Sequence, residues 1–477
     1  MKPMRPALGA AIEIASLLTI IAVTALLAVL GLVTLHACVW ITVLFMLGLL
    51  LLAWKRFEGG RHPCFLFLGM LFIFQCGLPL GYVMGMIDNP MQIVVATFTP
   101  ITVPIAAAEI TLLLIALSAV LIYAPCRLQP GSPGFWAGDA RRWLPGVYAL
   151  LILTLPFALY KNVMYLSYIR AHGGYLAVYT DNAAVLASAG FIARTLSTIN
   201  DTAILTAYIL ESRPGRRRMV LTLFFLLASL DLLIGFRGKF FAEAISLWFI
   251  HNLRTGRRFR LGQIAMVGAL ASMAALMVAG FRENRVTSLV SPLGVVVAQG
   301  VSMNVTEAAV VFHREFARFG WSYLWNGFLN GITPVAQGPG KLWTWDLTVA
   351  LNRAAFERGF GTASAYLAEL YLFAGLPAVM LGSLGIGYGL RWLQRASARL
   401  SGALVMVFIL PSVIYLPRLE LLAPFGALLK AAVGLVIVAA FVVFYQAACH
   451  LVRLALTRRG GHDALSGGSG DSPAPAR

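Results

Sequence analysis

The residues best suited to chemistry lie in a polar stretch of the sequence between Phe281 and Gly361. Its cations are Arg282, Arg285, Arg314, Arg318, Lys341, Arg353 and Arg358. Five carboxylates and four tryptophans are interleaved with them. A guanidinium group holds phosphate through paired, charge-assisted hydrogen bonds, and an indole ring offers a flat apolar face. Such a stretch suits an anionic, sugar-bearing substrate that is tethered to a membrane.

Arg282 and Arg285 are the leading candidates for binding a diphosphate. They are three residues apart at the end of an apolar run, so they share a face if that helix continues. Two like charges on one face repel unless an anion bridges them, and each charge-assisted hydrogen bond contributes about 1.5–3 kcal/mol. A salt bridge from these arginines to Glu283, or to a neighbouring loop, is an interpretation of equal weight.

Arg237 and Lys239 form a second cationic pair, in a tight turn that contains glycines at 235 and 238. Glycine lets the backbone approach an oxyanion closely, which favours a phosphate clamp. The alternative is an anchor at the level of the lipid head groups, in which Lys239 pairs with Glu243 one helical turn later.

Transfer of a proton requires a base, and the candidates are Glu369, Glu283 and His313. Glu369 lies in an apolar run, where a charge needs a cation or a water-filled cavity. Arg418, in a later turn, is its expected partner and a further candidate for binding phosphate. His313 is the least favoured of the three, because a lone histidine is more often structural than catalytic.

Arg314 follows the apolar run 301–312, whose spacing is helical. The spacing predicts an amphipathic helix that lies on the outer leaflet with its basic face at the head groups. The second interpretation of Arg314 is a phosphate ligand beside the other outward-facing arginines.

Several signals of other chemistries are absent from the sequence. It contains no Walker A loop, no His-Glu-x-x-His pair, no nucleophile elbow and no paired acidic metal motif. The five cysteines lack metal-ligand spacing, so we predict no disulfide, no metal site and no cofactor. The net charge of +18 does not imply nucleic acid, because positive residues flank membrane spans for topological reasons.

The elements that must position these residues are membrane helices. Hydrophobic residues make up 60% of the chain and charged residues 12%, and apolar runs long enough to cross a bilayer recur throughout. We predict an all-α polytopic membrane protein with about twelve transmembrane helices and both termini in the cytoplasm. The predicted spans are 8–32, 34–54, 64–86, 104–124, 144–160, 184–210, 219–236, 240–253, 261–280, 363–390, 400–416 and 421–448.

This topology predicts a single integral membrane domain over residues 1–458. Its large periplasmic loop is expected at 281–361 and a second periplasmic loop at 161–183. Residues 459–477 are rich in Gly, Ser and Pro and are expected to form a disordered cytoplasmic tail.

The second half of the sequence resembles bacterial O-antigen and exopolysaccharide repeat-unit polymerases of the Wzy type. The likeness lies in the segments 233–241, 361–369 and 372–377 and in the glycine-rich run 382–389. The predicted number of spans and the large late periplasmic loop are also similar to that family. An Arg-x10-Gly signature of some members is missing from both major outer loops.

The resemblance implies a glycosyltransferase of the inner membrane that polymerises undecaprenyl-diphosphate-linked oligosaccharides at the periplasmic face. It implies no external energy source, because the leaving group is already a diphosphate. The expected partners are the lipid-linked oligosaccharide, membrane lipids and a chain-length-regulating membrane protein. Two alternatives stay open: an O-antigen ligase, which uses the same donor, and a polysaccharide transporter or flippase.

Overall fold

The computed structural model describes residues 4–466 except for 88–91, 94–100, 129–133, 137, 139, 173–181, 235–236, 261, 265, 267, 269–272, 274–291, 317–318, 334, 336–337 and 358–361. The first half contains α1 (Met4–Val29), α2 (Leu35–Arg56), α3 (Pro63–Val83), α4 (Ile105–Leu128), the short helix η1 (Arg141–Trp143), α5 (Leu144–Ala171), α7 (Asn182–Ser188), α8 (Phe191–Leu210) and α9 (Pro214–Ile234). The second half contains α10 (Arg237–Thr255), α12 (Pro292–Gln299), α13 (Ser302–Val311), α14 (Trp321–Ile332), α15 (Trp343–Glu357), α16 (Tyr366–Ala396), α17 (Leu400–Tyr415), the short helix η2 (Leu416–Arg418) and α18 (Ala423–Ser466). The strands β1 (Gln92–Ile93) and β2 (Ile101–Thr102) form a short antiparallel pair.

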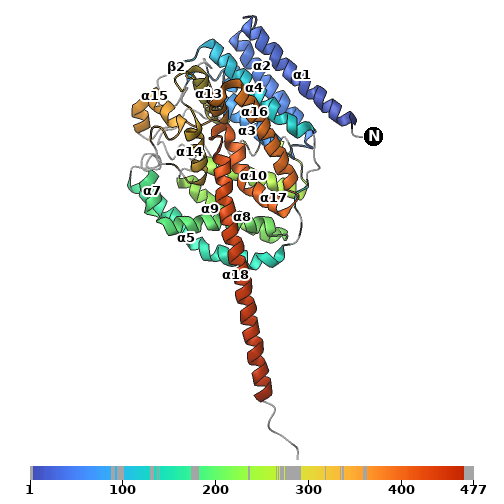
Figure 1. Cartoon of the computed structure of the whole chain (residues 1–477), viewed down its shortest axis with the longest axis vertical. Helices are drawn as coiled ribbons and strands as arrows, with labels where there is room; N and C mark the ends of the chain where they lie inside the picture. Colours follow the sequence, from blue (N-terminus) through green and yellow to red (C-terminus); the bar gives the residue numbers. More distant parts are fainter. Residues whose placement is uncertain are drawn as a thin grey trace, which may run out of the picture.

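The helices form a bundle, and the first part of α18 packs on its outside before the helix continues as a single rod below the other helices (Figure 1). In this view α1, α2 and α4 lie at the upper right, and α5, α8 and α9 lie in the lower part. The short helices α7, α14 and α15 lie on the left, away from the N-terminus on the right and from the end of α18 at the bottom.

Nine helical segments within the described residues are long and apolar enough to cross a membrane: Leu8–Val29, Leu35–Arg56, Pro63–Val83, Ile105–Leu128, Arg141–Ala171, Leu293–Val311, Tyr366–Ala396, Leu400–Arg418 and Ala423–Leu454. Eight of them occupy positions that the sequence predicts as spans. Helices α8, α9 and α10 also form at predicted spans but are more polar, and the predicted span 261–280 lies largely outside the described residues. The protein is therefore a helical, multi-pass membrane protein.

Small residues let the central helices approach one another closely. A Cβ atom on Gly300 would lie 2.2 Å from the backbone nitrogen of Leu78, and one on Gly77 would lie 2.5 Å from the carbonyl oxygen of Val296. Neither position has room for a side chain, so α3 and the α12–α13 pair meet backbone to backbone. Such contacts are common between membrane helices, where close van der Waals packing replaces the hydrophobic effect as the driving force.

The structure overturns the prediction of an amphipathic surface helix over 301–312. Every residue from Ser302 to Ala309 is buried, and α13 packs against α3, α4 and α16. The prediction is wrong because this run is packed between other helices, where one of its polar side chains finds a hydrogen-bond partner. Thr306 donates a hydrogen bond to the amide oxygen of Gln75 at 3.1 Å.

Helices α5 and α18 extend more than ten residues beyond their predicted ends. Helix α5 continues to Ala171, through the first part of the loop expected at 161–183. Helix α18 continues to Ser466, past the residue at which the tail was expected to begin. The stretch 449–459 is rich in Leu and Arg, which have high helix propensity.

Candidate functional site

Two buried carboxyl groups, Glu369 and Glu420, meet where α16 begins and where the chain leaves η2. We call these two residues the carboxyl pair. Glu369 is 2% exposed, and its carboxyl accepts hydrogen bonds from the Ser364 hydroxyl at 2.9 Å and from the Leu421 N–H at 2.8 Å. The two donors belong to segments about 60 residues apart, so this carboxyl joins the start of α16 to the turn after η2.

Glu420 is 7% exposed, and its Oε2 atom makes no hydrogen bond to any described residue. Burial raises the pKa of the Glu420 carboxyl above its usual value, although a hydrogen bond from Asn330 opposes the shift. The charge of Glu420 also acts on Glu369. Two carboxylates that share an apolar environment repel each other, so their proton affinities are coupled.

Helix α14 fixes the position of Glu420. A Cβ atom on Gly327 would lie 2.9 Å from the Cβ of Glu420, and one on Gly331 would lie 2.1 Å from the carbonyl oxygen of Ala423. Only glycine permits this approach of α14 to the start of α18. The glycines at 327 and 331 therefore form part of the wall of the carboxyl pair.

Arg418 does not form the ion pair with Glu369 that the sequence predicts. Its Nη1 atom donates a hydrogen bond to the Gln299 amide oxygen at 2.6 Å, and its guanidinium carbon lies 5.7 Å from the centroid of the Phe74 ring. The prediction is wrong because Glu369 already has two donors from its own neighbourhood. Since its partners are a neutral amide and a ring, Arg418 keeps a charge that can attract an anion.

Gln75, on α3, holds the η2 turn that carries Arg418. Its Nε2 atom donates hydrogen bonds to the carbonyl oxygens of Pro417 at 2.9 Å and Ser302 at 3.4 Å. Its Oε1 atom accepts the bond from Thr306 on α13. Gln75 is fully buried, so this small network fixes the η2 turn against α3 and α13.

His313 and Arg314 lie near the same end of α16. The imidazole centroid of His313 is 5.4 Å from the ring centroid of Tyr371, which is two residues after Glu369. Both His313 and Arg314 are exposed, in contrast to the buried carboxyl pair. The structure thus brings predicted residues from three segments to one end of α16.

The start of α10 adjoins this region through aromatic rings. A Cβ atom on Gly238 would lie 2.6 Å from the hydroxyl oxygen of Tyr415. The Tyr415 ring packs edge to face on Phe74, with 5.0 Å between centroids, and Phe74 is the ring that Arg418 covers. The side chain of Arg237 lies outside the described residues, so its predicted role stays a prediction.

Lys239 belongs to a second charged group, which lines a narrow cavity between α5, α8, α9 and α10. We call this group the lysine–carboxylate cluster; it consists of Lys161, Asp201, Asp231, Lys239 and Glu243. Lys239 lies 3.0 Å from Asp231 and 3.9 Å from both Asp201 and Glu243. Lys161 lies 3.6 Å from the other oxygen of Asp231. The contact predicted between Lys239 and Glu243 is therefore present, as one of several.

Lys430, on α18, lies close enough to the cluster for its charge to interact with Lys239, Asp201 and Glu243. The group then combines three lysines with three carboxylates and is formally neutral. Charges inside a bilayer are tolerated when they pair with one another, and this arrangement meets that condition.

Sequence reasoning identified only part of these two groups. It identifies Glu369 but assigns no role to Glu420 or to Asp231. A lone acid in an apolar run is a usable signal, but its partners come from other helices. The predicted residues Arg282, Glu283 and Arg285 lie outside the described residues.

The two groups differ in what they can do chemically. In the carboxyl pair, a carboxylate can accept a proton from an incoming hydroxyl while its neighbour stays neutral. Arg418, on the adjoining turn, can bind an anionic group through its guanidinium fork. In the lysine–carboxylate cluster, the charges are engaged with one another and serve to hold four helices together.

A family model described as O-antigen polysaccharide polymerase Wzy matches residues 11–447 of the chain. No curated protein and no solved structure shows significant similarity to it. The matched range includes the carboxyl pair, the η2 turn and the lysine–carboxylate cluster.

Proposed function

Because this chain belongs to the O-antigen polysaccharide polymerase Wzy family, and so polymerises lipid-linked oligosaccharide repeat units, we propose that the carboxyl pair and the η2 turn form its catalytic centre. The observation that carries this proposal is the position of Glu369. It is a buried carboxyl, hydrogen-bonded to the turn that presents Arg418, beside a second buried acid.

In the proposed reaction, the donor is a glycan attached to a lipid diphosphate and the acceptor is a hydroxyl of another repeat unit. Glu369, in its ionised form, takes the proton of the acceptor hydroxyl as the oxygen attacks the anomeric carbon. A new glycosidic bond forms, and the bond from the anomeric carbon to the phosphate oxygen breaks. The electron pair of that bond leaves with the diphosphate.

Arg418 would stabilise the charge that develops on the leaving diphosphate. Arg282 and Arg285 are proposed to share this task with Arg237 and Arg314. Lys239 is the weakest of the phosphate candidates, because three carboxylates surround it. Glu283 and His313 are the alternative bases.

The proposal includes a topology and a substrate. Twelve spans would place both termini in the cytoplasm and the carboxyl pair at the periplasmic face of the inner membrane, as one integral membrane domain over 1–458. The donor would be undecaprenyl-diphosphate-linked, and a chain-length-regulating membrane protein would act with the enzyme. The positive-inside distribution of Lys and Arg supports this orientation.

The decisive test replaces Glu369 by Gln in a strain that lacks the chromosomal gene. Since general bases contribute about 10²–10⁴-fold, the Glu369→Gln protein should yield lipopolysaccharide with a single repeat unit while inserting normally into the membrane. Glu357→Gln is the matched control, because Glu357 is an exposed acid that pairs with Arg353 at 3.1 Å. Wild-type glycan length in the Glu369→Gln strain would remove Glu369 from the reaction.

A second test concerns the arginines of the 281–361 stretch. Arg282→Ala and Arg285→Ala should abolish chain extension without affecting membrane insertion, because each removes a proposed diphosphate ligand. The gene deletion itself should leave a single repeat on the core. Loss of all O-antigen from the core would instead indicate a ligase.

A further inference from the structure

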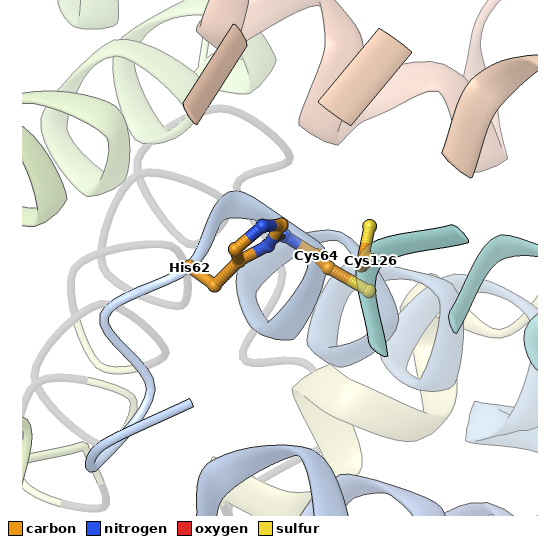
Figure 2. A group of neighbouring side chains, drawn as sticks. All are labelled: His62, Cys64 and Cys126. Atoms are coloured by element: carbon orange, nitrogen blue, oxygen red, sulfur yellow. Dashed lines mark hydrogen bonds between the residues drawn. The ribbon is translucent and has the colours of Figure 1, made fainter. Parts of the chain in front are cut away.

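His62, Cys64 and Cys126 form a group of potential metal ligands at the start of α3, about three helical turns before Gln75, which holds the η2 turn. One ligand atom of each residue lies within 4.8 Å of the ligand atoms of the other two. His62 and Cys64 stand at the start of α3, whereas Cys126 comes from the last turns of α4 (Figure 2). The sequence spacing gives no sign of such a site, because the third residue is 62 positions away from the second.

The three side chains are enclosed by protein. His62 is 5% exposed, and Cys64 and Cys126 are 0% exposed. Both cysteines are free thiols. Figure 2 shows the two cysteine side chains next to each other, with the imidazole ring on the same helix as Cys64.

Neighbouring groups fix the orientation of these ligands. The His62 ring stacks on Phe57 with 4.6 Å between centroids and an interplanar angle of 23°. Its Nδ1 atom accepts the Cys64 N–H at 3.1 Å, and the Cys126 thiol donates to the Gly387 carbonyl oxygen at 3.3 Å. These contacts hold the three side chains next to one another before any ion binds.

We propose that His62, Cys64 and Cys126 bind a thiophilic divalent metal ion, with zinc as the best match. Two thiolates and a neutral imidazole are the ligand types that zinc prefers, and their charge of −2 balances the ion. That balance matters because an uncompensated charge is costly inside a bundle. Binding displaces the two thiol protons and replaces the hydrogen bond from the Cys64 N–H to His62 by a bond from the ring to the metal. Water or a backbone carbonyl would complete the tetrahedron.

The metal would tie α3 to α4, because its ligands come from these two helices. Cys126 also lies 3.3 Å from the Gly387 carbonyl oxygen on α16, and the hydrogen bond between them is given up when the thiol releases its proton to bind the ion. Helix α4 packs closely on α16 there, because a Cβ atom on Gly387 would lie 2.5 Å from the Ile122 carbonyl oxygen. Helix α16 also carries Glu369 at its far end. The metal would therefore stabilise the helices that support the proposed catalytic centre, without contacting the catalytic residues.

The test uses the full-length protein purified in detergent without chelator. We expect about one zinc ion per chain, and a sulfur-to-metal charge-transfer band in the near ultraviolet when Co²⁺ replaces zinc. Both signals should disappear in the Cys64→Ser/Cys126→Ser double variant. They should persist in Cys76→Ser, a buried cysteine further along α3, and in Cys449→Ser on α18.

Thermal unfolding supplies an independent readout. Added Zn²⁺ should raise the Tm of the chelator-treated wild-type protein but not that of the double variant, because only the former binds the ion. Should the double variant not fold, His62→Gln takes its place. Wild-type protein that holds less than about a tenth of a zinc ion per chain and shows no Co²⁺ band would overturn the proposal. So would a band that survives in the double variant.

Discussion

The carboxyl pair and the lysine–carboxylate cluster both place acidic groups among apolar helices, but they balance their charge differently. In the cluster, each carboxylate has a lysine within 3.9 Å, and Asp231 has two. In the carboxyl pair, the donors are neutral groups: a hydroxyl and a backbone N–H at Glu369 and the Asn330 amide at Glu420. The Oε2 atom of Glu420 has no hydrogen bond to a described residue. The nearby guanidinium of Arg418 pairs with an amide.

The difference separates structural charges from candidate catalytic ones. Opposite charges that pair with each other inside a membrane protein link helices, and they have few hydrogen-bonding groups free to bind a ligand. Carboxyl groups held without a cation have a perturbed affinity for protons, which is what proton transfer requires. Two criteria are therefore needed to identify a candidate catalytic residue. The first is that a charged residue lies in an apolar span, and the second is that its partner is not an opposite charge.

The largest effect that would sharpen this comparison is expected at Arg418. Arg418→Ala removes a charge-assisted contact to the diphosphate, so chain extension in membranes should slow by roughly 10- to 150-fold, equivalent to about 1.5–3 kcal/mol. Arg418→Lys should recover part of the rate, because it restores the charge but not the planar fork.

The measurement for Arg418 is incorporation of labelled repeat units into membranes that contain equal amounts of each protein. Arg353→Ala is the control, since Arg353 is 80% exposed in a surface pair with Glu357. Equal rates in the Arg418→Ala and Arg353→Ala proteins would contradict the role of the η2 turn.

An intermediate effect is expected at the pair formed by Asp231 and Lys239. Asp231→Asn and Lys239→Met should each lower the free energy of unfolding by about 1–2 kcal/mol, a value reduced from that of a fully buried pair because Lys239 is 45% exposed. The double variant should lose less than the sum of the two, because the interaction can be lost only once. Glycan length should stay normal in all three.

The double-mutant cycle is measured by denaturation in detergent, with glycan length followed in cells. Loss of chain extension in a Lys239→Met protein of normal stability would return Lys239 to the phosphate-binding site. That result would also remove the distinction between the two charged regions.

Sequence reasoning was most successful where physical constraints are local. Span length and apolarity predicted the positions of most long helices, from α1 to α18. They failed for α12 and α13, because burial of a polar run depends on partners such as Gln75 that are distant in sequence. Glu13 on α1 is a similar case, because its partners Arg56 and Arg127 lie on α2 and α4.

The candidate site shows the same limit. An acid within an apolar run singled out Glu369, but the second acid, Glu420, stands beside a turn and has no distinctive pattern. Its burial results from the approach of Gly327 on α14. Contacts between turns and helices are decided by packing, which a sequence pattern does not show. The sequence predicts Arg418 as the partner of Glu369 only because both are expected near the same side of the membrane.

The smallest expected effect is a pH dependence of stability that has opposite signs at two glutamates. Burial raises the pKa of Glu420, so the folded protein binds a proton at a pH at which the unfolded chain has released it. The stability that Glu420 contributes is complete below the ordinary glutamate pKa and is lost as the pH rises through the raised value. The slope cannot exceed about 1.4 kcal/mol per pH unit.

Glu211, in the connector between α8 and α9, supplies the matched opposite case. Burial alone would raise its pKa, but the Arg213 N–H and the Tyr148 hydroxyl, both at 2.8 Å, lower it overall. The stability that Glu211 contributes is present above the ordinary glutamate pKa and is lost as the pH falls.

Thermal unfolding between about pH 4 and pH 9 tests both glutamates. Glu420→Gln should remove the loss of stability at high pH, and Glu211→Gln should remove the loss at low pH. Identical pH profiles for Glu420→Gln and Glu211→Gln would mean that Glu420 is in no more apolar an environment than Glu211. The contrast between the carboxyl pair and the lysine–carboxylate cluster would then fail.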